Sequence, residues 1–140
     1  MLTKEDNQKI VTAIQSAERQ TSGEVVVHIE KSCASDPYQR ALHWFKKLKL
    51  HQTVQRNGVL ILLIEKQRRF AIVGDQGIHA AVQQGYWDHE AELLSQAFKA
   101  GRYADGLCAT IVAIGEKLQT HFPSQGKNDI NELGDKITHS

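Results

Sequence analysis

The sequence is poor in cysteine, and the few cysteines it has exclude the common cysteine-based sites. Its 140 residues include only Cys33 and Cys108. The two do not form a CxxC pair, and their neighbours do not supply the ligand spacing of a zinc site. We therefore expect two free thiols in a reducing compartment, with a disulfide between them as the alternative.

An excess of charge of one sign is missing, and so is any long hydrophobic run. The chain has 17 basic and 16 acidic side chains, a formal net charge of +1, so strong salt-sensitive binding to nucleic acid is not expected. The longest apolar run, residues 59–64, is far shorter than the roughly 20 residues that span a bilayer. Residues 1–6 contain no apolar segment of a secretory signal. These features predict a cytoplasmic protein that does not bind the membrane.

Familiar catalytic and nucleotide-binding motifs are also missing. The seven histidines show no HExxH spacing, and the loop Gly74-Asp75-Gln76-Gly77 matches neither a P-loop nor GxGxxG. No set of residues forms a recognisable catalytic triad, so the sequence does not identify an enzyme by motif.

What is present is the pattern of a single globular α/β domain. Apolar residues make up 41% of the chain and charged residues 24%, which suits one core and argues against disorder. Apolar spacing, β-branched runs and turn residues predict, in order, a helix from Thr3 to about residue 20, a strand at 24–30, a helix starting at Asp36-Pro37, strands at 58–64 and 69–73, a short helix near 78–82, and helices at 87–99 and from about 103 to Pro123.

The main order of elements is therefore α-β-α-β-β-α-α. A strand–helix–strand unit should make strands 24–30 and 58–64 parallel, and the hairpin that follows should reverse strand 69–73, which gives a small mixed sheet. The domain is predicted to cover residues 1–123. Residues 124–140 are polar with scattered apolar side chains, and we expect this tail to be loosely held.

This topology predicts a cluster of oxygen ligands at one edge of the sheet. The start of the first strand and the end of the third should lie at the same edge, which brings Ser22, Gly23 and Glu24 close to the loop 74–77. Carboxylates, an amide side chain and carbonyls at glycine-rich turns are hard ligands that suit Ca²⁺ or Mg²⁺ better than zinc.

Each acidic residue also has a purely structural interpretation. Glu24 can be a solubilising charge at the end of a strand, and Asp75 is a natural turn former. Asp88 lies in the first turn of a helix, where a negative charge is favourable, and Asp105 can cap the last helix. The sequence leaves both interpretations open for all four residues.

Four segments together resemble the TPM-domain family, which includes thylakoid-lumen photosystem-repair proteins and bacterial single-domain relatives. They are Thr21-Ser22-Gly23-Glu24 before a valine-rich strand, residues 57–62, residues 69–78, and residues 98–107 with Gly101-Arg102-Tyr103-Ala104-Asp105-Gly106-Leu107. The resemblance covers about residues 3–122. In the tail, residues 128–133 resemble the short bacterial subgroup.

The resemblance implies a three-layer α/β/α sandwich, divalent-cation binding, and an acid phosphatase activity suggested for plant relatives. The positions that match are Glu24, Asp75 and Asp105, with Asp88 less securely placed. The chain departs from many relatives in its loop 74–79, which is one residue longer and lacks their glutamate. We also expect it to lack their signal peptide and C-terminal membrane segment.

Three functions are therefore considered. The first is a Ca²⁺- or Mg²⁺-binding domain with a structural or regulatory role, and with Glu24 and Asp75 as core ligands. The second is a metal-assisted phosphatase at the same edge, with Arg69 and Arg102 as phosphate clamps. The third is a protein-interaction module that uses exposed aromatic side chains near the same loops. Those side chains are Tyr86, Trp87 and Tyr103.

Overall fold

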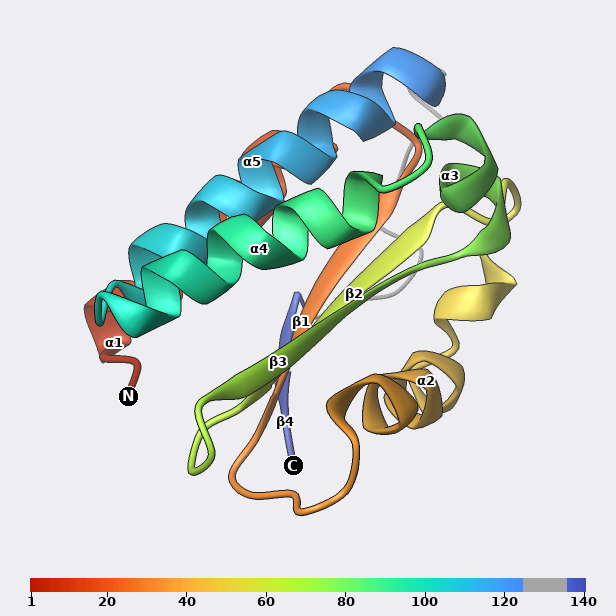
Figure 1. Cartoon of the computed structure of the whole chain (residues 1–140). Helices are drawn as coiled ribbons and strands as arrows, with labels where there is room; N and C mark the ends of the chain where they lie inside the picture. Colours follow the sequence, from red (N-terminus) through yellow and green to blue (C-terminus); the bar gives the residue numbers. More distant parts are fainter. Residues whose placement is uncertain (125–135) are drawn as a thin grey trace.

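A computed structural model of the chain describes residues 1–124 and 136–140. The predicted elements form nearly where the sequence places them (Figure 1). In chain order they are α1 (Lys4–Glu18), β1 (Glu24–Glu30), α2 (Pro37–Lys47), the 3₁₀ turn η1 (Leu50–Gln52), β2 (Gly58–Ile64), β3 (Arg69–Gly74), α3 (Gln76–Ala81), α4 (Tyr86–Lys99), α5 (Tyr103–His121) and β4 (Ile137–His139).

The first two helices begin at the caps that the sequence indicates. The Thr3 hydroxyl accepts the Asp6 backbone N–H, and the Asp6 carboxylate accepts the Thr3 N–H, which satisfies two otherwise unpaired donors. At α2 the Asp36 carboxylate accepts the Gln39 N–H, and Pro37 occupies the first helical position.

The sheet is mixed, with strand order β3-β2-β1-β4. β1 pairs with β2 in parallel, with Glu24 opposite Gly58, and β2 pairs with β3 in antiparallel. The predicted parallel pair and the predicted hairpin are therefore both confirmed. The structure adds η1 and the strand β4, which the sequence did not indicate.

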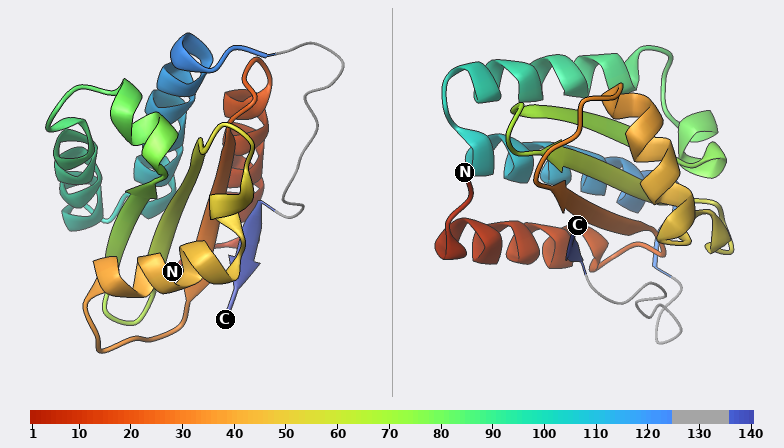
Figure 2. Two further views of the ribbon diagram at one scale, coloured as in Figure 1. Left: turned by 90° about the vertical axis from the view of Figure 1, so that its right-hand side faces the viewer. Right: turned by 90° about the horizontal axis from the view of Figure 1, so that it is seen from below.

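Two helical layers cover the sheet, so the three-layer α/β/α fold is confirmed. Helices α4, α5 and α1 lie side by side on one face with α5 in the middle, and α2 covers the other face (Figure 2). Strand β1 divides its residues as its alternation predicts. Val25, Val27 and Ile29 face the three-helix layer, and Val26 faces α2. Every residue of β2 is buried, as a strand covered on both faces requires.

The expectation of a loosely held C-terminal tail is wrong for residues 136–140. These residues form β4, which pairs in parallel with β1 between Val27 and Ile29. The Val27 N–H donates to the Lys136 carbonyl at 2.9 Å, and the Ser140 N–H donates to the Ile29 carbonyl at 3.0 Å. The remaining tail residues, 125–135, include the segment 128–133 that resembles the bacterial subgroup, and they lie outside the described residues.

Polar contacts fix the register of β4. His28 is fully buried beside Trp44, with 4.1 Å between the ring centroids. Its Nδ1 lies 2.6 Å from the Thr138 hydroxyl, and its Nε2 lies 2.9 Å from the Ser140 hydroxyl. Ser140 in turn donates to a Glu30 carboxylate oxygen at 3.2 Å. One neutral tautomer satisfies the whole chain of bonds: Thr138 donates to Nδ1, and Nε2–H donates to Ser140.

The same carboxylate is held from α2. Arg40 donates to both oxygens of Glu30 at 2.8 and 2.7 Å, and the indole N–H of Trp44 donates at 3.2 Å. These bonds keep the pKa of Glu30 below its usual range, with the Arg40 hydrogen bonds as the largest cause. The buried polar groups of β1 therefore have partners on β4 and on α2.

His28 should make the fold sensitive to acid. Burial lowers the pKa of this imidazole from 6.5 to about 4, so the ring takes up a proton at a lower pH in the folded protein than in the unfolded chain. The stability that the neutral ring contributes is fully present above pH 6.5 and is lost as the pH falls toward 4. Between pH 7.5 and pH 5 we expect the His28→Gln variant to lose about 2 kcal/mol less than the unsubstituted chain. Urea unfolding of both proteins at the two pH values measures this difference, and equal losses would contradict it.

Candidate functional site

The sheet edge predicted to gather carboxylates is formed as expected. Glu24 opposes Gly58 across the parallel pair, and the Asp75 N–H donates to the Gly58 carbonyl at 2.9 Å. Glu24 and Asp75 therefore flank the same residue of β2, one on each side. Both are buried. This edge is reached by the start of β1, the start of β2 and the end of β3 (Figure 1).

Asp75 has two structural tasks at this edge. It caps α3 by accepting the Gln76 N–H at 2.8 Å. It also accepts two hydrogen bonds from Arg56, from Nε at 2.6 Å and from an Nη at 2.9 Å. This bidentate pair raises the pKa of the Arg56 guanidinium. The residue predicted as a cation ligand thus already faces a cation of the chain itself.

Glu24 shares one ammonium group with a second carboxylate. Lys136, next to β4, donates to Glu24 and lies 2.9 Å from a carboxylate oxygen of Glu18 at the end of α1. Glu18 also accepts the Val25 N–H at 2.7 Å. The Glu18 and Glu24 carboxylates therefore lie near the same ammonium group in a largely buried place. Burial, and then the nearby Glu24 carboxylate, raise the pKa of Glu18 to about 7.

Asn57 is the residue at this edge that sequence reasoning missed. It is fully buried directly before β2, its Nδ2 donates to the Ser22 hydroxyl at 3.1 Å, and its N–H donates to Thr53. Its side-chain carbonyl oxygen, Oδ1, has no hydrogen-bond partner among the described residues. A buried acceptor without a partner is costly, and such an acceptor is a common place for an ion or an ordered water. A polar residue immediately before an entirely apolar strand was the signal available in the sequence.

The other two predicted ligands lie in different places. Asp88 is exposed in the first turn of α4, at the same end of the sheet, because the neighbouring Trp87 ring packs against Gly74 at the end of β3. Asp105 lies in the first turn of α5, beside Tyr103, whose ring faces Arg68 of the β2–β3 turn. That turn is at the opposite end of β3, about 17 Å from Gly74.

The predicted four residues therefore do not come together as one set. Glu24 and Asp75 share the edge, Asp88 is at the same end, and Asp105 is at the other end of the sheet. In residues 1–124 and 136–140 no group of three or more histidine, cysteine, aspartate or glutamate side chains is arranged to hold a metal ion. Cation binding by these residues stays a prediction.

Two expectations about neighbouring side chains are wrong. Arg69 begins β3 and Arg102 caps α5, so both lie at the far end and cannot clamp a phosphate at the Glu24 edge. The aromatic residues expected to be exposed together are half-buried and separated. Tyr86 and Trp87 pack on each other near α3, and the Trp87 indole donates to His79, whereas Tyr103 is at the far end.

Both cysteines are free thiols and half-buried, as expected. No helix within the described part of the chain is long and apolar enough to cross a membrane. The cytoplasmic location stays a prediction.

Comparison with known proteins places this architecture in a family. The family model of the TPM domain matches residues 1–117, which is most of the chain. The chain belongs to the TPM-domain family. The resemblance seen in the sequence is thus confirmed. No curated protein matches the chain.

Solved structures of other proteins have the same fold. The protein BA42 of the psychrophilic bacterium Bizionia argentinensis is 38% identical, with a TM-score of 0.88 over 100% of this chain and 96% of BA42. An N-terminal domain from P. gingivalis is 19% identical, with a TM-score of 0.70 over 86% of this chain and 78% of that one. The N-terminal domain of cg2496 from Corynebacterium glutamicum is 16% identical, with a TM-score of 0.63 over 96% and 84%. The last two likenesses concern the fold alone.

Proposed function

We propose that this TPM domain binds a divalent cation, Ca²⁺ or Mg²⁺, at the sheet edge formed by Glu24, Asn57 and Asp75. The observation that carries the proposal is the Asn57 Oδ1 atom, a buried carbonyl oxygen without a partner in the described chain. It precedes Gly58, the residue that Glu24 and Asp75 flank. Two carboxylates and an amide carbonyl are the donor set that hard cations prefer.

The charge at this edge supports the same proposal. Glu18 and Glu24 both contact Lys136, and burial, followed by the nearby Glu24 carboxylate, raises the pKa of Glu18. A divalent cation would stabilise the ionised form of these carboxylates. Perturbed carboxylates of this kind gather at functional sites more often than elsewhere. The role of the bound ion would be structural or regulatory, since it would join the starts of β1 and β2 to the end of β3.

The chain's own cations set the affinity. A bound ion has to share Asp75 with Arg56 and Glu24 with Lys136. This competition predicts weak binding, with a Kd on the order of 10⁻⁴ to 10⁻³ M.

Calorimetric titration of chelator-treated protein with Ca²⁺ and with Mg²⁺ tests the proposal. We expect saturable binding that weakens at least ten-fold in the Asp75→Asn variant, since asparagine keeps the helix cap and loses the charge. Arg56→Gln should strengthen binding several-fold, because it removes the competing guanidinium. The matched control is Asp36→Asn, which makes the same change at the cap of α2, beyond the opposite end of β1. Absence of binding to either ion, or equal binding by Asp75→Asn, would refute the proposal.

A further inference from the structure

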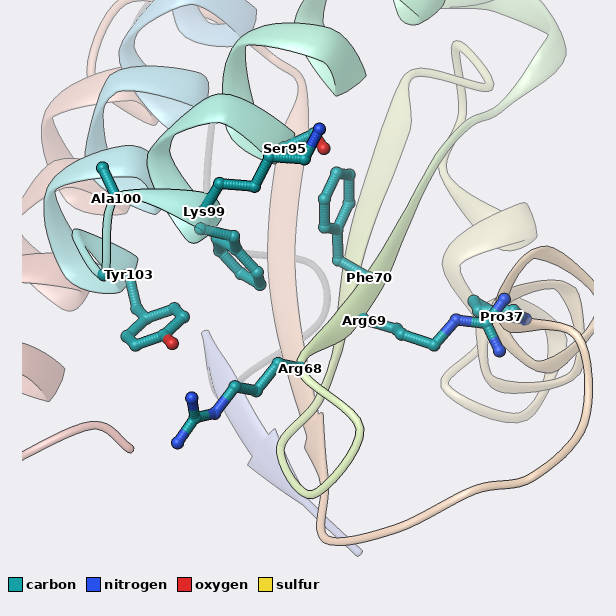
Figure 3. A pocket seen from close by; sticks show the side chains of 10 residues that line it. Pro37, Arg68, Arg69, Phe70, Ser95, Lys99, Ala100 and Tyr103 are labelled. Carbon is teal, nitrogen blue, oxygen red and sulfur yellow. The ribbon is translucent and has the colours of Figure 1, made fainter.

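A cleft of about 720 Å³ opens at the end of the sheet opposite the Glu24 edge (Figure 3). It lies between the β2–β3 turn, the last turn of α4, the start of α5 and Pro37 at the start of α2. Its volume is in the range of small-molecule sites, which is roughly 300–1,000 Å³. The six lining residues that matter are Arg68, Arg69, Phe70, Phe98, Lys99 and Tyr103.

The rim of the cleft carries positive charge alone. Arg68, Arg69 and Lys99 line it, and no aspartate or glutamate is among the described lining residues. None of the three has a carboxylate within ion-pairing distance in the part of the chain that the structure describes. In a chain whose net charge is only +1, three uncompensated cations around one cleft create a local site for an anion.

The floor of the cleft is aromatic. Phe70 and Phe98 meet edge to face with their centroids 5.2 Å apart, and Phe98 meets Tyr103 in the same way at 5.1 Å. Phe70 and Tyr103 are only half-buried, so part of each ring is available to a ligand. A flat apolar ring would find similar edge-to-face or stacked partners here.

The backbone conformation of Arg68 places its guanidinium at the cleft. Its backbone φ of 53° is left-handed, a conformation that turns usually assign to glycine or asparagine. The turn instead places an arginine there, and its guanidinium lies 5.8 Å from the centroid of the Tyr103 ring. Figure 3 shows Arg68 reaching toward Tyr103, while Arg69 extends the other way toward Pro37. Lys49 and Arg56 share this left-handed conformation, so what distinguishes Arg68 is that its charge lines the cleft.

We propose that this cleft binds a small aromatic anion, a flat ring that carries a phosphate or carboxylate group. Arg68 and Lys99 hold the anionic group, and Phe70 and Tyr103 receive the ring. Arginine suits this task because its planar fork matches phosphate oxygens. The site is separate from the proposed cation edge, and neither depends on the other.

NMR titration of isotope-labelled protein, with a chelator present and at constant ionic strength, tests the inference. The probes are phenyl phosphate, inorganic phosphate for the anion alone, and benzyl alcohol for the ring alone. We expect phenyl phosphate to bind at least ten-fold more tightly than either partial probe, because it combines the ring contacts with those of the anionic group. The amide shifts should centre on residues 68–70 and 99–103.

Three variants complete the test. Arg68→Gln combined with Lys99→Gln should weaken phenyl phosphate binding at least ten-fold, whereas the control Lys46→Gln removes an exposed charge from α2 and should change nothing. Ser95→Phe fills the cleft with its charges intact and should also abolish binding. It keeps the inference testable if the double variant fails to fold. Scattered shifts, equal affinity for inorganic phosphate, or binding that survives Ser95→Phe would overturn the inference.

Discussion

Replacing Lys136 by methionine is expected to destabilise the protein by about 3–4 kcal/mol at pH 8, because it removes a cation that two buried carboxylates contact. Glu24 and Glu18 both face this ammonium group, and only about a tenth of the lysine side chain is exposed. Without it, the two carboxylates lose a cation in a largely buried place. Urea unfolding at equilibrium measures the loss.

The dependence on pH identifies the cause. Glu18 has a folded pKa of about 7, above its ordinary 4.5, so the stability linked to its protonated form is fully present below pH 4.5 and is lost as the pH rises through 7. The destabilisation by Lys136→Met should therefore shrink as the pH falls from 8 to 5, because one carboxyl group then takes up a proton. Lys46→Met, on an exposed face of α2, serves as the control.

A double variant decides between charge and packing. Adding Glu18→Gln to Lys136→Met removes one of the two opposed charges and should recover at least about 1 kcal/mol at pH 8. If the lysine acts only through its aliphatic stem, the second substitution recovers nothing. A Lys136→Met protein as stable as the unsubstituted chain would show that this ammonium group does not hold β4 in place.

Gly77→Ala is expected to cost about 3 kcal/mol, although alanine normally stabilises a helix relative to glycine. A Cβ at this position would lie 2.2 Å from the Gln55 carbonyl oxygen and 2.6 Å from the Arg56 carbonyl oxygen. Both atoms belong to backbone, so neither can rotate away. The Gly77 N–H also donates to the Arg56 carbonyl at 2.8 Å, and the added methyl group would push this bond apart.

The comparison with Gly85→Ala separates contact from conformation. Gly85 has a φ of 83°, and no atom lies within 4 Å of the place that an alanine methyl group would take, so its substitution costs only the backbone strain of about 1 kcal/mol. Gly77→Ala should therefore be at least twice as destabilising in urea unfolding. Because the same segment carries Arg56 to Asp75, it should also alter the proposed cation site. A neutral or stabilising Gly77→Ala would mean that residues 55–56 can move aside at little cost.

The elements that the sequence predicted well are those with strong local signals. Thr3 and Asp36 predict the starts of two helices, because their side chains can cap the first backbone N–H groups. The apolar strand 58–64 and its hairpin partner follow from composition and a short turn. Because two adjacent strand pairings fix one edge, the placement of Glu24 and Asp75 on either side of Gly58 also follows from the order of the elements along the chain.

What the sequence did not indicate depends on packing between distant elements. β4 has only three residues, which is too short to show a hydrophobic pattern of its own. Its position depends on contacts of Thr138, Ser140 and Lys136 with partners more than 100 positions away. Asp105 lies far from the predicted site because α4 runs along the sheet to its other end before α5 begins. Helix direction over a sheet is not encoded in local spacing.

The short strand β4 also determines how the molecule can open. It is the cover on the outer edge of β1, and it contributes only a few backbone hydrogen bonds that close a loop of about 110 residues. Such a pairing forms late in folding and separates first, so the amide protons of Val27 and Ser140 should exchange with solvent sooner than those between β1 and β2. Each opening uncovers an unpaired strand edge, the kind of surface through which proteins aggregate. Loss of β4 is therefore expected to increase self-association, which light scattering of the intact and C-terminally truncated chains would measure.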